Sequence, residues 1–279
     1  MSHSADADSV KSVFLSAVQF ATSTHSFPPF IDDLKLSAQE QVEYMLVEDQ
    51  HAPLFINDDH VKSELRTCLS KMFSLFEVQA CSLLLQSDDS LEAAAKMALS
   101  SLSDIEWICK ILPKMDLMKD FVVSWLCISE KILAILREEN IDTFLWAFKL
   151  KLLEVLGKVL EAIGYGNVVL PTAARVCMLK LWLPYIRKWK LLLDLHDSSD
   201  QLCMYKIDSD LCHNIEAAIV SLVLALPSND QAEIFSDWLT AEKVTYPDLS
   251  EAFELWCFRS KAAKRRCMAG ENGVGAAPL

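Results

Sequence analysis

The feature that most constrains this chain is the spacing of its apolar residues, which recur every three or four positions along most of its length. In the segment from Val61 to about Gln86, these positions include Leu65, Cys68, Leu69, Met72, Phe73 and Phe76. Such spacing places apolar side chains on one face of an α-helix. Glycine is scarce: six occur, three of them in the last ten residues, so few hairpin turns are available. The sequence therefore predicts an all-α array of about ten or eleven helices in solenoid-like pairs, with no significant sheet.

Polar residues and prolines between the apolar segments predict where helices begin and end. A serine followed three positions later by Glu or Gln predicts a capping box at a helix N-terminus. Three such pairs occur: Ser37–Glu40, Ser103–Glu106 and Ser228–Gln231. Gly164 is predicted to end a helix in the left-handed conformation. Pro184 predicts a helix pair or a kinked helix, and residues 51–60, HAPLFINDDH, are predicted to form a loop.

The distribution of these helices predicts one domain. The chain has 279 residues, near the size at which single hydrophobic cores stop growing. Residues 1–9 are polar and acidic, and we expect a flexible N-terminus there. Residues 10–268 are expected to form a single all-α domain, with a sub-boundary considered near 196–207, where a polar stretch occurs. Residues 269–279 contain three glycines and are expected to be a disordered tail.

The charge of the chain is acidic but uneven. The net charge of −13 disfavours general binding to nucleic-acid phosphates, which needs clustered Lys and Arg. Residues 141–190 are an exception, with eight bases against three acids. The longest uncharged apolar run, Ala217 to Leu226, has ten residues. That is about half of a membrane span, so it predicts a buried core helix and no membrane partner.

The cysteines and histidines do not form a recognisable catalytic or metal-binding pattern. Nine cysteines are scattered among apolar residues, without the close pairs typical of zinc sites. Cys212 and His213 are adjacent, but a buried cysteine beside a surface histidine explains them better. The polar start is not a signal peptide, so we expect a reducing compartment, the cytoplasm or the nucleus. We predict no catalytic, metal or cofactor site, and therefore no cofactor and no enzyme activity.

Arg187, Lys188, Trp189 and Lys190 form the first candidate site. A tryptophan flanked by cations is typical of an interface anchor. We therefore predict that Trp189 is half-exposed and that the three cations bind an acidic or phosphorylated partner. The other six tryptophans follow apolar stripes and are predicted to pack in the core: Trp107, Trp125, Trp146, Trp182, Trp238 and Trp256.

Lys261, Lys264, Arg265 and Arg266 form a second basic cluster, near the C-terminus. Cations at a helix C-terminus complement the helix dipole, which is one interpretation of the cluster. A nuclear import signal and a contact with RNA or DNA are two others. The sequence leaves all three open.

Several longer motifs resemble plant BTB/POZ domain-containing proteins, in the helical region downstream of their BTB domain. They are FPPF, LKLSAQEQVEYML, SLSDIEWICKILPKMDLMKDFV, VLPTAARVCMLKLWLPYIRKWKLLLD, SLVLALPSNDQAEIFSDWL and YPDLSEAFELWCFRSKAAKRR. The resemblance covers roughly residues 10–268. It implies a BACK-like helical region in an intracellular plant protein. Relatives of this kind are proposed substrate adaptors of cullin-3 ubiquitin ligases, in which the BTB domain pairs with cullin and the helical part engages a target.

The resemblance implies recognition without catalysis. This sequence begins after the expected place of the BTB domain, so we expect contact with cullin-3 only if a longer form supplies that domain. We predict a non-catalytic protein-interaction module whose partner is a protein or a ubiquitination substrate. Two alternatives stay open: an all-α enzyme with an unrecognised pocket, and a nuclear nucleic-acid-associated protein.

Overall fold

The computed structural model describes residues 2–23, 31–47, 52–83, 88–136, 143–197, 209–241 and 246–271. Within these ranges the chain forms eleven α-helices and one 3₁₀ helix, and no strand, which confirms the predicted all-α array. The chain divides into two compact units, Met1–Val159 and Leu160–Leu279. The division falls inside a helix, and the sub-boundary near residues 196–207 stays a prediction. Most of that segment lies outside the described residues.

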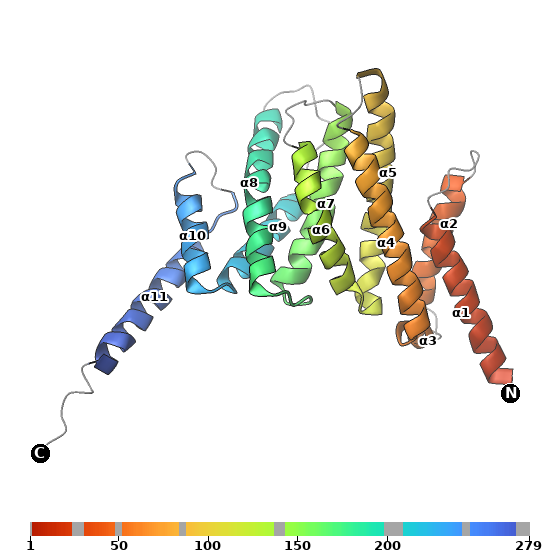
Figure 1. The fold of residues 1–279 in the computed structure, drawn as a ribbon, viewed down its shortest axis with the longest axis horizontal. Coiled ribbons are helices and arrows are strands. Elements are labelled where there is room, and N and C mark those ends of the chain that lie inside the picture. Colours follow the sequence, from red (N-terminus) through yellow and green to blue (C-terminus); the bar gives the residue numbers. More distant parts are fainter. Residues whose placement is uncertain are drawn as a thin grey trace, which may run out of the picture. The chain divides into compact units, whose positions relative to one another are not determined.

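The first unit is a series of helices that pack mainly against their neighbours in the sequence (Figure 1). In particular, the first helix packs on the second, and the fourth packs on the fifth and sixth. The first helix begins at Ser2, so it includes residues 2–9, and the flexibility of this terminus stays a prediction. The elements are α1 (Ser2–Ala21), α2 (Ile31–Val47), α3 (Ala52–Ile56), α4 (Asp59–Ser82), α5 (Asp88–Ile111), η1 (Leu112–Met115), α6 (Met118–Leu136) and α7 (Thr143–Gly164), which continues into the second unit.

Aromatic side chains contact one another in the core of the first unit. The rings of Phe14 and Phe55 stack with centroids 4.5 Å apart, and Phe73 meets Phe121 edge-on at 5.3 Å. Phe55 lies on α3, a short helix in the segment where the sequence predicts a loop, so that prediction is wrong. The physical reason is burial: helical backbone directs the Phe55 ring into the core, where it is fully buried.

Two of the three predicted capping boxes lie inside helices. Ser37 and Glu40 fall in the middle of α2, and Ser103 and Glu106 fall in the second half of α5. The Ser103 hydroxyl donates to the Leu99 carbonyl at 2.9 Å, as serines within helices do. These predictions are wrong because neighbouring helices hold the chain helical on both sides of each serine. Lys35 of α2, for example, pairs with Asp104 of α5 at 2.5 Å.

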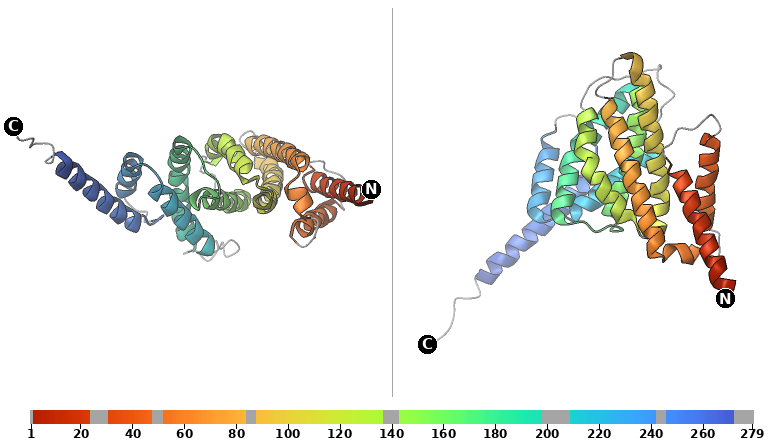
Figure 2. Two further views of the ribbon diagram at one scale, coloured as in Figure 1. Left: turned by 90° about the horizontal axis from the view of Figure 1, so that it is seen from below. Right: turned by 45° about the vertical axis from the view of Figure 1, so that its right-hand side comes forward.

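Among the described residues of the second unit, four helices follow the end of α7 (Figure 2). In α8 the chain continues through Pro184 as one helix rather than as a pair. The large buried side chains of this unit include Trp182 and Phe235. The four helices are α8 (Thr172–Asp197), α9 (Ser209–Leu224), α10 (Ser228–Leu239) and α11 (Ser250–Glu271).

Gly164 ends α7, but its role differs from the predicted left-handed cap. The left-handed glycine is Gly166, with a φ of 79°. At Gly164 an added Cβ would lie 2.7 Å from the Ala218 carbonyl oxygen, so glycine lets α7 and α9 approach closely. The Ser221 hydroxyl donates to the Gly164 carbonyl at 2.7 Å across this contact.

The third predicted capping box is also wrong. Pro227 occupies the N-cap position of α10, and it makes no side-chain capping bond. Gln231 is buried instead, and its amide donates to the Val223 and Leu224 carbonyls at 2.8 and 3.1 Å. The glutamine thus satisfies carbonyls at the C-terminus of α9, because the two helices meet at a tight corner.

Candidate interaction surfaces

The four residues of the first candidate site point to different sides of α8. Successive residues on a helix are separated by about 100°, and their exposure follows that rotation. Trp189 is 2% exposed, Lys188 is exposed, and Arg187 and Lys190 are half-buried. The prediction of a half-exposed Trp189 is therefore wrong: its ring lies in the core of the second unit. The prediction that the three cations bind an acidic partner stays a prediction.

The side chains of Arg187 and Lys190 interact with groups of their own unit. Burial lowers the pKa of the Arg187 guanidinium, and the attraction of Asp237 on α10 opposes that shift. Lys190 Nζ lies 6.0 Å from the centroid of the Tyr246 ring, at the outer limit of a cation–π contact. The Tyr246 hydroxyl donates to the Cys212 carbonyl at 2.7 Å. Of the four residues, Lys188 is the most open to solvent, since the other three are buried or half-buried.

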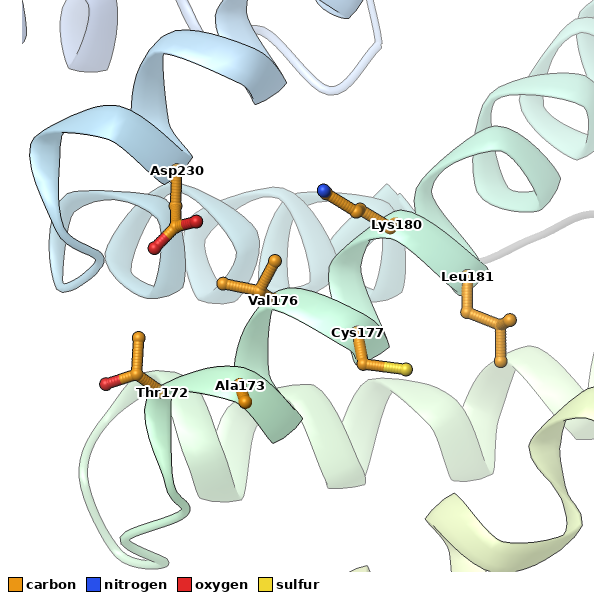
Figure 3. Close-up of a pocket in the computed structure, with 7 residues that line it drawn as sticks. All are labelled: Thr172, Ala173, Val176, Cys177, Lys180, Leu181 and Asp230. Atoms are coloured by element: carbon orange, nitrogen blue, oxygen red, sulfur yellow. The ribbon is translucent and has the colours of Figure 1, made fainter.

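A groove lies between α8 and α10, at the N-terminal end of α8 (Figure 3). Its volume is about 650 Å³. Apolar side chains of α8 form much of its lining, and Lys180 and Asp230 lie at its edge. The lining residues are Thr172, Ala173, Val176, Cys177, Lys180, Leu181 and Asp230.

Carboxylates on α10 dominate the charge beside this groove. Asp230, Glu233 and Asp237 follow one another at intervals of three and four, so they line one side of α10. Lys180 donates to Glu233 at 2.7 Å, and this hydrogen bond raises the pKa of Lys180, with further contributions from Asp230 and Asp237. Three carboxylates of α10 thus attract Lys180, and one of them, Asp237, also attracts Arg187.

Aromatic side chains anchor α11 to the rest of the second unit. The Phe235 ring contacts Phe253 and Trp256 at centroid distances of 5.4 and 5.6 Å. The Trp256 indole donates to the Ser228 hydroxyl at 3.0 Å, and the Trp238 indole donates to the Pro247 carbonyl at 3.1 Å. Trp238 and Trp256 are half-buried, whereas Trp107, Trp125, Trp146 and Trp182 are buried as predicted.

The second basic cluster lies on α11. Lys261 is exposed, and Lys264, Arg265 and Arg266 belong to the same helix, which continues to Glu271. The cluster is thus followed by at least one further helical turn rather than ending the helix. The import-signal and nucleic-acid interpretations stay predictions. The predicted tail beyond Glu271 lies outside the described residues.

Other site types find no support in the part of the chain that the structure describes. There, no three His, Cys, Asp or Glu side chains gather as metal ligands would. Among the same residues, no helix is both long and apolar enough to span a membrane. A second groove of about 440 Å³ lies between α2 and α5 in the first unit, where the Lys35–Asp104 ion pair forms part of its lining.

The groove and the outer side of α11 are surfaces that sequence reasoning missed. The signal for the first was the interval between Asp230, Glu233 and Asp237. The signal for the second was Phe258 falling outside the stripe of Ala252, Phe253 and Trp256. Neither signal identifies a surface until the position of the neighbouring helix is known.

Comparisons with known proteins point to BTB/POZ proteins. The model of the BTB/POZ ankyrin-like repeat family matches residues 46–263. The BTB/POZ domain-containing protein At3g05675 of Arabidopsis thaliana is 44% identical over 266 residues, which cover 94% of this chain and 60% of that protein. The BTB/POZ domain-containing protein At3g50780 of Arabidopsis thaliana is 25% identical over 207 residues, which cover 73% of this chain and 35% of that protein.

The chain thus spans 60% of the length of the first relative and about a third of the second. No solved structure matches it. The family model's match, residues 46–263, includes residues of both grooves and the part of α11 that packs on Phe235. Because that match extends over most of the sequence, the chain belongs to the BTB/POZ ankyrin-like repeat family.

Proposed function

We propose that this chain is a non-catalytic protein-interaction module that binds a segment of a target polypeptide in the groove between α8 and α10. The observation that carries the proposal is the groove itself, which combines an apolar lining with a charged edge. An apolar lining supplies binding energy, and a few charged groups fix orientation and specificity. Family membership supports recognition of proteins rather than catalysis.

The charges beside the groove favour a basic amphipathic segment as the occupant. Apolar side chains of such a segment would cover Ala173, Val176 and Leu181, which are exposed or half-exposed. Its Lys or Arg side chains would meet Asp230 and the exposed Asp237, since α10 has an excess of carboxylate over the cations that face it. Opposite charges at the edge of an interface speed encounter and select partners.

We further propose that the bound target is a substrate for ubiquitination. In this scheme the helical module holds the target, and contact with cullin-3 comes from a BTB domain in a longer form of the protein. The proposal rests on the BTB/POZ names of the relatives and on the family match. Under this proposal we expect the protein in the cytoplasm or the nucleus.

Selection of short peptides displayed on phage, with the immobilised chain as bait, tests the groove. We expect enriched sequences that combine apolar residues at helical spacing with Lys or Arg. Substitution Ala173→Arg fills the groove and repels cations, so peptide affinity should fall about tenfold. The matched control is Ala93→Arg, because Ala93 is an exposed helical alanine on α5 of the first unit and its replacement should change nothing.

Equal binding to wild type and Ala173→Arg would refute the groove as the site. Enrichment of acidic peptides that are lost with Lys188→Glu would favour the acidic-partner prediction for α8 instead. The ubiquitination proposal is tested in plant cells by fusing an enriched peptide to a fluorescent reporter. Reporter abundance should fall when a longer, BTB-containing form is co-expressed, and should recover with Ala173→Arg in that form. An unchanged abundance in both cases would contradict it.

A further inference from the structure

The outer side of α11 carries an apolar surface that no described residue of the chain covers. Phe258 is 74% exposed, and Leu255, one turn earlier, is 38% exposed. Phe258 is the most exposed aromatic side chain among the described residues. On the inner side of the same helix, Phe253 and Trp256 pack against Phe235. The helix is therefore anchored by one side, and on the other it exposes Leu255 and Phe258 next to the exposed Glu251.

Leu255 and Phe258 lie in the N-terminal half of α11, just before the part of the helix that projects. After leaving α9 and α10, the C-terminal half of α11 extends without another helix of its unit beside it (Figures 1 and 2). An exposed phenylalanine and leucine on a projecting helix are typical of a contact surface. Apolar exposure alone does not identify the occupant, but the charges next to it do.

Glu254 and Lys261 lie on one flank of the apolar surface. They are seven residues apart, about two helical turns, so they project on the same side of α11. Both side chains are exposed. Leu255 and Phe258 lie between them along the helix axis. The sequence of α11 thus places an acid before the apolar pair and a base after it.

This order of charges is complementary to itself. When two identical helices pair about a two-fold axis in antiparallel orientation, each flank meets the same flank of the other copy. Glu254 of one chain then lies opposite the partner's Lys261, and the reverse pair forms by symmetry. The apolar residues Leu255 and Phe258 meet their counterparts in the centre. A parallel pair would instead place Glu254 and its copy on opposite flanks of the contact, so that neither Glu254–Lys261 pair could form.

We propose that α11 binds the α11 helix of a second copy of this chain in an antiparallel pair, through Leu255 and Phe258 and two Glu254–Lys261 ion pairs. Opposed helix dipoles also favour this orientation. Because the apolar contact is small, the dimer is weak and depends on concentration. The pairing does not depend on the groove between α8 and α10.

Sedimentation equilibrium of the full chain over a range of concentrations tests the pairing. Wild-type protein should show a monomer–dimer equilibrium, and Phe258→Asp should abolish the dimer because it places a charge in the centre of the contact. Tyr44→Asp is the matched control, since Tyr44 is a 51% exposed aromatic residue on α2. A wild-type chain that stays monomeric at every concentration, or a dimer that survives Phe258→Asp, would overturn the proposal.

Charge reversal tests the antiparallel register. Glu254→Lys and Lys261→Glu should each weaken the dimer about tenfold, because each converts two attractive pairs into two repulsive ones. The double variant restores both pairs and should dimerise like the wild type. A mixture of the two single variants should form mixed dimers, because one chain then presents two lysines on this flank and the other chain presents two glutamates. Absence of rescue in both experiments would reject the register. Ala173→Arg should leave all these equilibria unchanged, which separates this pairing from the groove.

Discussion

The two units of this chain use charged residues differently. In the first unit, lysines on one helix pair with carboxylates associated with another: Lys11 with Asp58, Lys35 with Asp104, and Lys151 with Glu106. The side chains of these three pairs are 17–30% exposed, whereas two other pairs between helices of this unit, Arg66–Asp120 and Lys131–Glu77, are 32–57% exposed. In the second unit, the Lys180–Glu233 pair is 43% and 55% exposed, and further carboxylates lie beside it on α10.

This difference separates stability from recognition. Partly buried pairs that join helices restrict how those helices pack, whereas exposed pairs contribute little to stability. Exposed charges next to apolar side chains can still select a partner. The comparison therefore predicts that substitutions at the helix contacts of either unit change the free energy of unfolding. Substitutions at the groove edge and on the outer side of α11 should change association.

The largest change in stability is expected at Trp189, which the sequence predicts to be half-exposed and which is buried in the structure. Trp189→Ala should lower the free energy of unfolding by about 3–5 kcal/mol, because it removes a large buried side chain and leaves a cavity. Urea denaturation followed by circular dichroism measures this change. Lys188→Ala, one position away and exposed, is the control and should change stability by about 0.5 kcal/mol or less. Similar values for the two variants would show that Trp189 is not a core residue.

The next largest change in stability is expected at Gly164, and Gly166, two positions later, serves as the comparison. Gly164→Ala should cost about 1–3 kcal/mol, because its Cβ would lie 2.7 Å from the Ala218 carbonyl oxygen and force α7 and α9 apart. Gly166→Asn should be close to neutral, since asparagine tolerates a positive φ and no atom lies within 4 Å of an added Cβ. Thermal unfolding of both variants distinguishes these positions. A more damaging Gly166→Asn would contradict the close-approach explanation.

The smallest effect concerns the N-terminus of α4. Asp58 accepts from the His60 and Val61 amides at 2.9 and 3.0 Å. Asp58→Ala should lower the free energy of unfolding by about 1 kcal/mol at neutral pH. The Lys11 hydrogen bond, followed by these backbone bonds, lowers the pKa of Asp58 below 3.8. The stabilisation is therefore present above pH 3.8 and is lost as the pH falls through the lower pKa of the folded state.

Urea titrations of wild type and Asp58→Ala at several pH values check this linkage. The difference in stability between them should shrink in acid. Asp59→Ala is the control, because Asp59 is exposed and makes no such capping bond. A difference that stays constant from neutral pH to below the folded pKa would exclude a charged cap.

Sequence reasoning succeeded where one residue reports on one local property. The stripe of Leu65, Leu69 and Phe76 is buried as predicted. It failed where a residue has two possible uses. Ser37 and Ser103 suit a helix cap as well as a helix interior, and only the helices packed around them select the second. Phe55 suits a loop as well as a short helix, and its burial selects the helix.

The sequence by itself determined the class of this fold, because apolar spacing and the lack of glycine are properties of each segment alone. It also contained motifs that are specific enough to indicate the family. The tertiary structure decided which side of each helix is covered. That choice depends on neighbours distant in sequence. They bury Trp189, although a lysine stands on each side of it in the sequence, and they leave Phe258 exposed on α11. A helical pattern gives the direction of every side chain, but only packing determines whether water or protein lies there.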